Sequence, residues 1–176
     1  DLLGSAVGLV LLAPLFLGVS IAIKLDSPGP VFFKQARLGL FGKEYKMYKF
    51  RTMCQNAEHK KVGLYSFAGD LRITKVGNWL RKASIDELAQ LINVFIGNMS
   101  LVGPRPPVTY ELGDFATLSR RYKKRFRVKP GITGLAQVIG RNKNTWEGKV
   151  NLDNQYIEKL QKQGIWIDII ILLKTV

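Results

Sequence analysis

Two neighbouring acids, Asp86 and Glu87, follow the basic residue Arg81 at the expected start of a helix. Backbone N–H groups at a helix start have no helical partner and hold phosphate well. A carboxylate that attacked a phosphoryl group there would leave its product in a site already built to stabilise an anion. Arg81 could neutralise phosphate oxygens, as could Lys49 and Arg51 at the end of a predicted strand. This grouping indicates phosphoryl-transfer chemistry.

The same acids also have a structural interpretation. The segment from Ser84 to Glu87 is a capping-box pattern, in which Ser84 begins the helix and Glu87 bonds back to it. Acids in a first helical turn are stabilised by the helix dipole as well. By itself this pattern favours the structural role, and only the grouping with basic residues supports the chemical one.

The sequence offers little for other kinds of catalysis. Its single histidine, His59, has no second histidine with which to build a zinc site, and a serine-type triad would need the same residue. Glycine-rich phosphate motifs of the Walker or dinucleotide type are missing. The single cysteine, Cys54, excludes an internal disulfide and suits a reducing compartment.

The charge balance requires a negatively charged partner. Lys and Arg total 27 against 13 Asp and Glu, which gives a formal net charge of +14. Nucleic acid, an anionic membrane surface and phosphorylated substrates would each satisfy this excess. The length of 176 residues fits one domain with its own core.

The first residues are apolar enough to enter a membrane. From Leu2 to Ile23 there is no charged residue over 22 positions, and a straight helix of that length would be roughly 33 Å long, about the hydrocarbon thickness of a bilayer. A buried core helix is the alternative. Pro14 removes a backbone hydrogen bond near the middle, so the helix either crosses with a kink or bends back. Because the downstream sequence is basic, that side is predicted to be cytoplasmic.

A small α+β domain must position the acids and the cations. The runs Val31–Gln35 and Tyr45–Phe50 predict a β-hairpin, whereas the segment from Arg51 to Gly69 has a weak pattern and is expected to be mobile or irregular. Prolines on both sides of Arg105 predict a rigid loop that holds this side chain in a fixed place. The spacing of apolar residues predicts helices at Ile85–Ile96, Tyr110–Phe126 and Leu152–Leu160, and the tail Ile165–Val176 is expected to pack or to lie on a membrane.

Seven basic residues fall within ten positions between Arg120 and Lys129. Such a run is usually a solvated face. Tyr122 and Phe126 interrupt it, as expected for a helix that lies among lipid headgroups with an apolar stripe turned inward. Together with the apolar N-terminal segment, this favours the interfacial interpretation.

Several segments carry a likeness to a known family: Asp70–Gly77, Leu80–Leu88, Asn93-Val94, Met99–Pro106, Lys129–Val138, Gly140–Asn142, Leu152-Asp153 and Tyr156. In this order they resemble the bacterial sugar transferase family, the monotopic phosphoglycosyl transferases that start the assembly of surface polysaccharides and glycoproteins. The apolar start, the stretch Lys49–Met53 and the apolar tail are also similar. The sequence departs from the family at Ala89, usually proline, and at Asn154-Gln155. The basic stretch that in the family normally precedes the position of Asp1 is missing, as expected for a chain that begins at Asp1 rather than Met.

The resemblance implies a mechanism and a site. Asp86 would be the nucleophile of a covalent aspartyl-phosphosugar intermediate, and Glu87 would assist as a base or through a metal. Mg²⁺ at these two acids would offset the diphosphate charge. Further positions match residues that line the family's active site: Lys49, Arg51, Arg81, Arg105, Arg141 and Asp153. The family's N-terminal helix is re-entrant and broken at a proline that matches Pro14, which favours re-entry here.

We therefore expect one α+β domain, mainly helical with a small β-hairpin and amphipathic interfacial helices. Residues 1–25 would form a re-entrant membrane helix, and residues 26–176 a cytoplasmic, membrane-associated catalytic domain at the bacterial inner membrane. A homodimer is compatible with the sequence, and a nucleic-acid partner is not expected.

The expected reaction transfers a sugar phosphate from a nucleotide diphosphate sugar to polyprenyl phosphate and releases a nucleoside monophosphate. The expected donor is a UDP-sugar. The reaction would be the first membrane step of surface glycoconjugate synthesis. The alternatives are a glycosyltransferase that releases nucleoside diphosphate, and a non-enzymatic membrane-tethered module that binds nucleic acid or anionic lipid. Product identity separates the two enzymes, and dependence on Asp86 separates both from the third.

Overall fold

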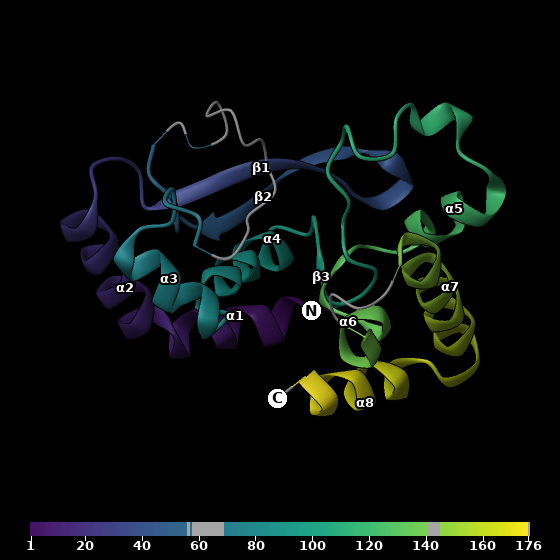
Figure 1. Ribbon diagram of the computed structural model, residues 1–176. Coiled ribbons are helices and arrows are strands. Elements are labelled where there is room, and N and C mark those ends of the chain that lie inside the picture. Colours follow the sequence, from purple (N-terminus) through teal and green to yellow (C-terminus); the bar gives the residue numbers. More distant parts are fainter. Residues whose placement is uncertain (56, 58–68, 141–144, 176) are drawn as a thin grey trace.

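The computed structural model describes residues 1–55, 57, 69–140 and 145–175. Arg141 and most of the weak segment 51–69 therefore lie outside the described residues. Figure 1 shows a β-hairpin across the upper part of the molecule, helices α1 to α4 beneath one end of it, α5 and α7 beside the other end, and α8 along the lower edge. This arrangement agrees with the predicted α+β class.

The apolar N-terminal segment forms two helices rather than one. Helix α1 (Leu2–Leu11) and helix α2 (Ala13–Asp26) are bent by 60° at Leu12. Pro14 lies in the first turn of α2, where a missing N–H costs little, so the break falls just before it. Within the described part of the chain no single helix is long and apolar enough to cross a membrane, but this bent pair passes that test by length and composition.

The predicted hairpin is confirmed. Strand β1 (Phe32–Leu38) pairs antiparallel with strand β2 (Glu44–Phe50), and the turn η1 (Leu40–Gly42) connects them. Both strands extend beyond the predicted runs toward this turn. On one side, Phe50 packs edge to face against Phe16 of α2 at a centroid distance of 5.1 Å, which fixes the hairpin to the N-terminal helices.

The predicted helix from Ile85 to Ile96 starts differently from the capping-box model. Helix α3 (Lys75–Lys82) ends just before Ser84, which takes a left-handed conformation with φ of 55° and makes no side-chain cap. The chain continues as a 3₁₀ helix, η3 (Ile85–Gln90), and then as α4 (Leu91–Phe95). An N-cap residue needs an extended backbone, and the sharp turn out of α3 keeps Ser84 from adopting that conformation. The capping-box prediction was wrong.

The predicted helix from Tyr110 to Phe126 was also wrong. Gly113 has φ of 67°, and only short helical pieces follow: η4 (Phe115–Thr117), α5 (Arg120–Lys124) and η5 (Arg125–Arg127). Asp114 and Ser119 accept hydrogen bonds from Ala116 N–H and Tyr122 N–H and so begin new helices. These local caps compete with one continuous helix.

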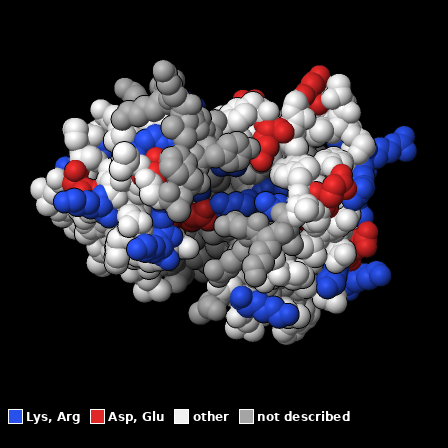
Figure 2. Space-filling model, viewed as in Figure 1, with Lys and Arg blue, Asp and Glu red and all other residues white. Residues whose placement is uncertain are grey.

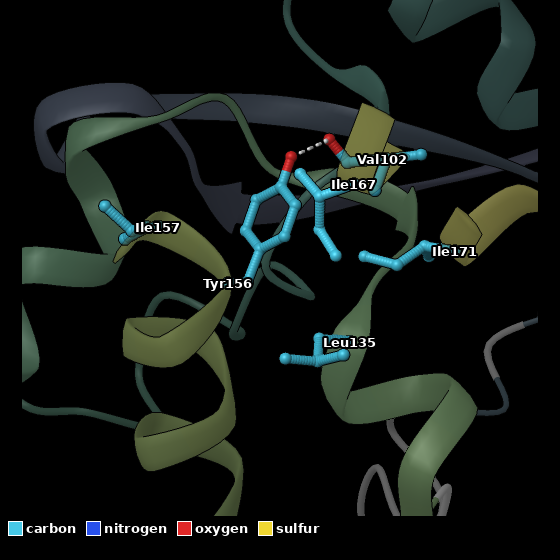
Figure 3. Packing of buried hydrophobic residues seen from close by; sticks show 6 residues of the cluster. All are labelled: Val102, Leu135, Tyr156, Ile157, Ile167 and Ile171. Carbon is cyan, nitrogen blue, oxygen red and sulfur yellow. Dashed lines mark hydrogen bonds between the residues drawn. The ribbon is translucent and has the colours of Figure 1, made fainter. Parts of the chain in front are cut away.

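The C-terminal half packs around a parallel strand pair. Strand β3 (Ser100–Val102) pairs with β4 (Gly131–Thr133), followed by α6 (Leu135–Gly140), α7 (Trp146–Gln163) and α8 (Ile165–Thr175). A Cβ at Gly131 would lie 2.0 Å from the Gly103 nitrogen, so the close approach requires glycine. Figure 3 shows the core between these elements, where Tyr156 donates a hydrogen bond to the Val102 carbonyl at 3.3 Å. The helix predicted at 152–160 is confirmed, and the tail 165–175 is helical.

Candidate active site

Glu87 is the centre of a cluster of charges drawn from three elements. Its Oε1 accepts hydrogen bonds from Lys49 Nζ on β2 and from Arg105 Nη2 in the loop after β3, both at 2.7 Å. Burial alone would raise the pKa of Glu87, but the charges and hydrogen bonds of Arg105 and Lys49 outweigh it and hold that pKa far below its usual range. Glu87 is therefore an anion that binds two cations.

Asp86 has a different environment from its neighbour. The residue is 9% exposed, and no described Lys or Arg lies within ion-pair distance of its carboxylate. Burial raises the pKa of Asp86, the positive charges of Lys49 and Arg81 oppose this rise, and the charge of Glu87 adds to it. Asp86 is therefore a carboxylate close to cations that other acceptors already engage, which is a suitable state for a nucleophile.

Lys49 acts on both acids from the end of the hairpin. Its side chain is 18% exposed, and burial lowers the pKa of its amine while Glu87 opposes that effect. The pairing of Phe33 with Lys49 in the hairpin fixes the strand register at this position. Figure 2 shows basic and acidic side chains meeting in the central part of the displayed face.

The loop that carries Arg105 is tied to its surroundings through its backbone. Arg37 Nη1 donates to the Pro106 carbonyl at 2.9 Å, and Leu38 N–H donates to the Pro107 carbonyl at 3.1 Å. Arg125 Nη2 donates to the carbonyl of Arg105 itself at 2.7 Å. These bonds hold the Arg105 side chain against Glu87, as the flanking prolines predicted.

Asp153 supports this loop from a distance. It is 2% exposed, and its Oδ2 lies 2.9 Å from Arg125 Nη2, the same nitrogen that holds the Arg105 carbonyl. Burial raises the pKa of Asp153 to about 6, although Arg125 opposes the rise. Its contact is with Arg125 rather than with the acids, so we interpret Asp153 as a support of Arg105.

Arg51 also supports the structure around the site rather than contacting the acids. Its guanidinium donates to the carbonyls of Ser27, at 2.7 Å, and of Pro28 at the end of α2. This contact joins the N-terminal helices to β2, and we interpret Arg51 as an anchor rather than a phosphate ligand. Arg81 differs, because its Nε donates to Thr52 Oγ1 at 2.9 Å and its charge reaches Asp86.

Part of the basic run between Arg120 and Lys129 is neutralised by helix α7. Arg121, Lys124 and Arg125 form ion pairs with Glu147, Glu158 and Asp153, at distances from 2.7 to 2.9 Å. Arg120, Arg127 and Lys129 are exposed. The interfacial interpretation stays a prediction and now rests on these three exposed residues.

Comparison with known proteins decides the family. A family model described as bacterial sugar transferase matches residues 1–176. The chain belongs to the bacterial sugar transferase family. The predicted family is thereby confirmed.

This chain is similar over its whole length to three known proteins. It is 42% identical to the UDP-glucose:undecaprenyl-phosphate glucose-1-phosphate transferase of Escherichia coli (strain K12), with 100% of the chain matching 38% of that protein. It is 39% identical to the UDP-N-acetylgalactosamine-undecaprenyl-phosphate N-acetylgalactosaminephosphotransferase of Aeromonas hydrophila, matching 41% of that protein. It is 36% identical to the exopolysaccharide production protein ExoY of Rhizobium meliloti, matching 81% of that protein. The chain thus spans about four-tenths of the first two relatives.

The two acids Asp86 and Glu87 fit one mode of magnesium binding. Among the described residues no group of three or more His, Cys, Asp or Glu side chains is placed to hold a metal. Mg²⁺ in many phosphate-transfer sites is held by only one or two carboxylates, with substrate phosphates and water completing its shell. The carboxylate of Asp86, together with the less engaged Oε2 of Glu87, fits that mode.

Several supporting residues of the candidate site could not be found from the sequence. Arg125 is the one buried member of its basic run, and Arg37 lies on a strand whose partner loop is far along the chain. Asn93 lies in a segment that resembles the family, but that segment gives no sign of its contacts with β2. Each acts on a backbone group of a distant segment, and sequence spacing carries no signal of such a contact.

Proposed function

We propose that this sugar transferase moves a sugar phosphate from a UDP-sugar to undecaprenyl phosphate through a covalent intermediate on Asp86, and that it releases UMP. The names of the relatives supply the substrate classes. The observation that carries the proposal is the Asp86 carboxylate, buried and outside any described ion pair, beside the cations Lys49, Arg81 and Arg105.

In the first step, an oxygen of Asp86 attacks the phosphorus that carries the sugar. The bond between that phosphorus and the bridging oxygen of the diphosphate breaks, and UMP leaves with the electron pair. Lys49 and Arg105 lie within reach of Glu87, so incoming phosphate oxygens would share these cations and spread the growing charge. Mg²⁺, held by Asp86 and Glu87, would supply further neutralisation of the diphosphate.

In the second step, a phosphate oxygen of undecaprenyl phosphate attacks the same phosphorus. The bond to Asp86 breaks, the carboxylate is regenerated, and the product is an undecaprenyl diphosphate sugar. Because the acceptor is already an anion, this step needs no base to remove a proton. Glu87 then serves to hold Lys49 and Arg105 in place between turnovers.

Product analysis tests this reaction against its alternatives. The protein is given a panel of UDP-sugars with undecaprenyl phosphate, and the nucleotide product is identified. The proposal expects UMP with at least one sugar. Release of UDP would instead show a glycosyltransferase, and the absence of any nucleotide product across the panel would favour a non-enzymatic module.

We also propose that residues 1–25 enter the cytoplasmic face of the bacterial inner membrane and return to it, leaving residues 26–176 on that face. The support is the break before Pro14 and the large apolar side chains exposed along α1, α2 and α8, among them Leu3, Leu25, Trp166 and Leu173.

Pro14→Ala should shift the N-terminal segment toward spanning the membrane, because it restores an N–H donor and helix propensity at the break. A cysteine placed ahead of Asp1 in a Cys54→Ser background reports the change through labelling from the periplasmic side of intact cells. Gly18→Ala is the matched control, since it raises helix propensity in α2 away from the break. Periplasmic labelling without the Pro14 change would contradict re-entry.

The pH dependence of the first step should report the raised pKa of Asp86. The ionised form is the nucleophile, so kcat/KM for UMP release should fall as the pH drops through that raised pKa, above the range of an ordinary aspartate. Lys49→Met removes a charge that lowers this pKa and should move the acid limb to higher pH. Lys49→Arg keeps the charge and should leave the limb near its original position. An identical limb in both variants would mean that the titrating group is not Asp86.

A further inference from the structure

Asn93 on α4 joins the helical segment that carries the acids to strand β2. It is 0% exposed. Its Oδ1 accepts a hydrogen bond from Tyr48 N–H at 2.8 Å, and its Nδ2 donates to the Lys46 carbonyl at 2.9 Å. One side chain thus satisfies two backbone groups of the strand that ends in Lys49.

The bonded groups lie on the edge of β2 that has no strand partner among the described residues. The sheet has two strands, and β1 occupies the other edge of β2. A carboxamide has the same donor and acceptor as a peptide group, so Asn93 takes the place of a residue in a neighbouring strand. Without it, Tyr48 N–H and the Lys46 carbonyl would each lose a partly buried hydrogen bond.

This contact sets where Lys49 lies relative to the acids. Glu87 contacts Lys49 and Asn93 contacts Lys46 and Tyr48, so η3 and α4 run along the same edge of β2. A slip of two residues would move Lys49 by roughly 6.6 Å along the strand. That displacement would separate its Nζ from Glu87 and withdraw its charge from Asp86.

We propose that Asn93 is a positioning residue of the active site. Its carboxamide fixes the register between β2 and the helical segment formed by η3 and α4, and so holds Lys49 beside Asp86 and Glu87. The consequence for turnover rests on the proposed function. The register itself does not, which allows the two to be tested separately.

Amine labelling tests the register without any turnover. Trace acetylation followed by peptide mass spectrometry measures the labelling of Lys49 relative to Lys162, an exposed lysine at the end of α7. Asn93→Leu removes both hydrogen bonds at similar volume and should raise the labelling of Lys49 about tenfold or more. Asn154→Leu is the matched control, because Asn154 likewise donates to a backbone carbonyl, that of Arg121, but on α7. It should leave Lys49 unchanged.

The second readout is kcat for UMP release. Asn93→Leu should lower kcat as Lys49→Met should, and the double variant should lose no more than Lys49→Met alone because both act through Lys49. If Asn93→Leu does not fold, Asn93→Asp serves instead, since it keeps the acceptor for Tyr48 and loses only the donor to Lys46.

Unchanged Lys49 labelling, or an additive loss of kcat in the double variant, would overturn the role of Asn93. If the wild-type protein released no UMP, the proposed function would fail, and the labelling comparison alone would still decide whether Asn93 sets the register.

Discussion

Asp86→Asn should lower kcat for UMP release by about 10⁴-fold or more, because it keeps the shape of the side chain and removes the proposed nucleophile. Its thermal unfolding should remain close to that of the wild type, since the Asp86 carboxylate takes part in no described ion pair. Initial rates with UDP-sugar and undecaprenyl phosphate, measured on protein of verified Tm, give this comparison.

Glu87→Gln is an informative comparison with Asp86→Asn, because it changes the adjacent acid. It leaves Asp86 intact but removes the charge that binds Lys49 and Arg105, so turnover should be slow rather than absent. If Asp86→Asn retained turnover comparable to that of Glu87→Gln, Asp86 would not be the nucleophile.

Asp153→Asn should destabilise the folded protein by about 3–5 kcal/mol, because it leaves the buried guanidinium of Arg125 without its counter-charge. Turnover should fall as well, since Arg125 also holds the carbonyl of Arg105. The free energy of unfolding in detergent, followed by urea titration, measures the first effect.

Two comparisons make that test specific. Glu158→Gln breaks an exposed ion pair on the same helix and should leave the free energy of unfolding nearly unchanged. The double variant Asp153→Leu with Arg125→Met should recover stability while its turnover stays low. A recovery of full turnover in the double variant would show that Arg125 does not position Arg105.

The elements that depend on local pattern were predictable. The hairpin, the helix near the acids, the break at Pro14 and the helix at 152–160 follow from hydrophobic period and from proline chemistry. The predictions that failed depend on competition between neighbouring segments. Ser84 cannot cap a helix because the end of α3 forces it into a left-handed conformation, and the segment 110–126 breaks because Asp114 and Ser119 start new turns.

The residue types of the candidate site were predictable from the sequence, but the role of each residue was not. The structure brings five of the predicted residues close together, and their roles in the reaction stay predictions: Asp86, Glu87, Lys49, Arg81 and Arg105. Arg51 and Asp153 matched the same motifs, yet their contacts are with the end of α2 and with Arg125. A motif records that a position matters, and only the contacts in space show whether its side chain faces the substrate or supports one that does.

The central claim is tested most directly by intact-protein mass spectrometry of the wild type mixed with UDP-sugar alone. Without an acceptor the first step should stop at the intermediate, so the mass should increase by one sugar phosphate, with one equivalent of UMP released. Peptide mapping should place the adduct on Asp86, and Asp86→Asn should acquire none. An adduct on another residue, or rapid turnover with no trapped adduct under any quench, would contradict the covalent mechanism.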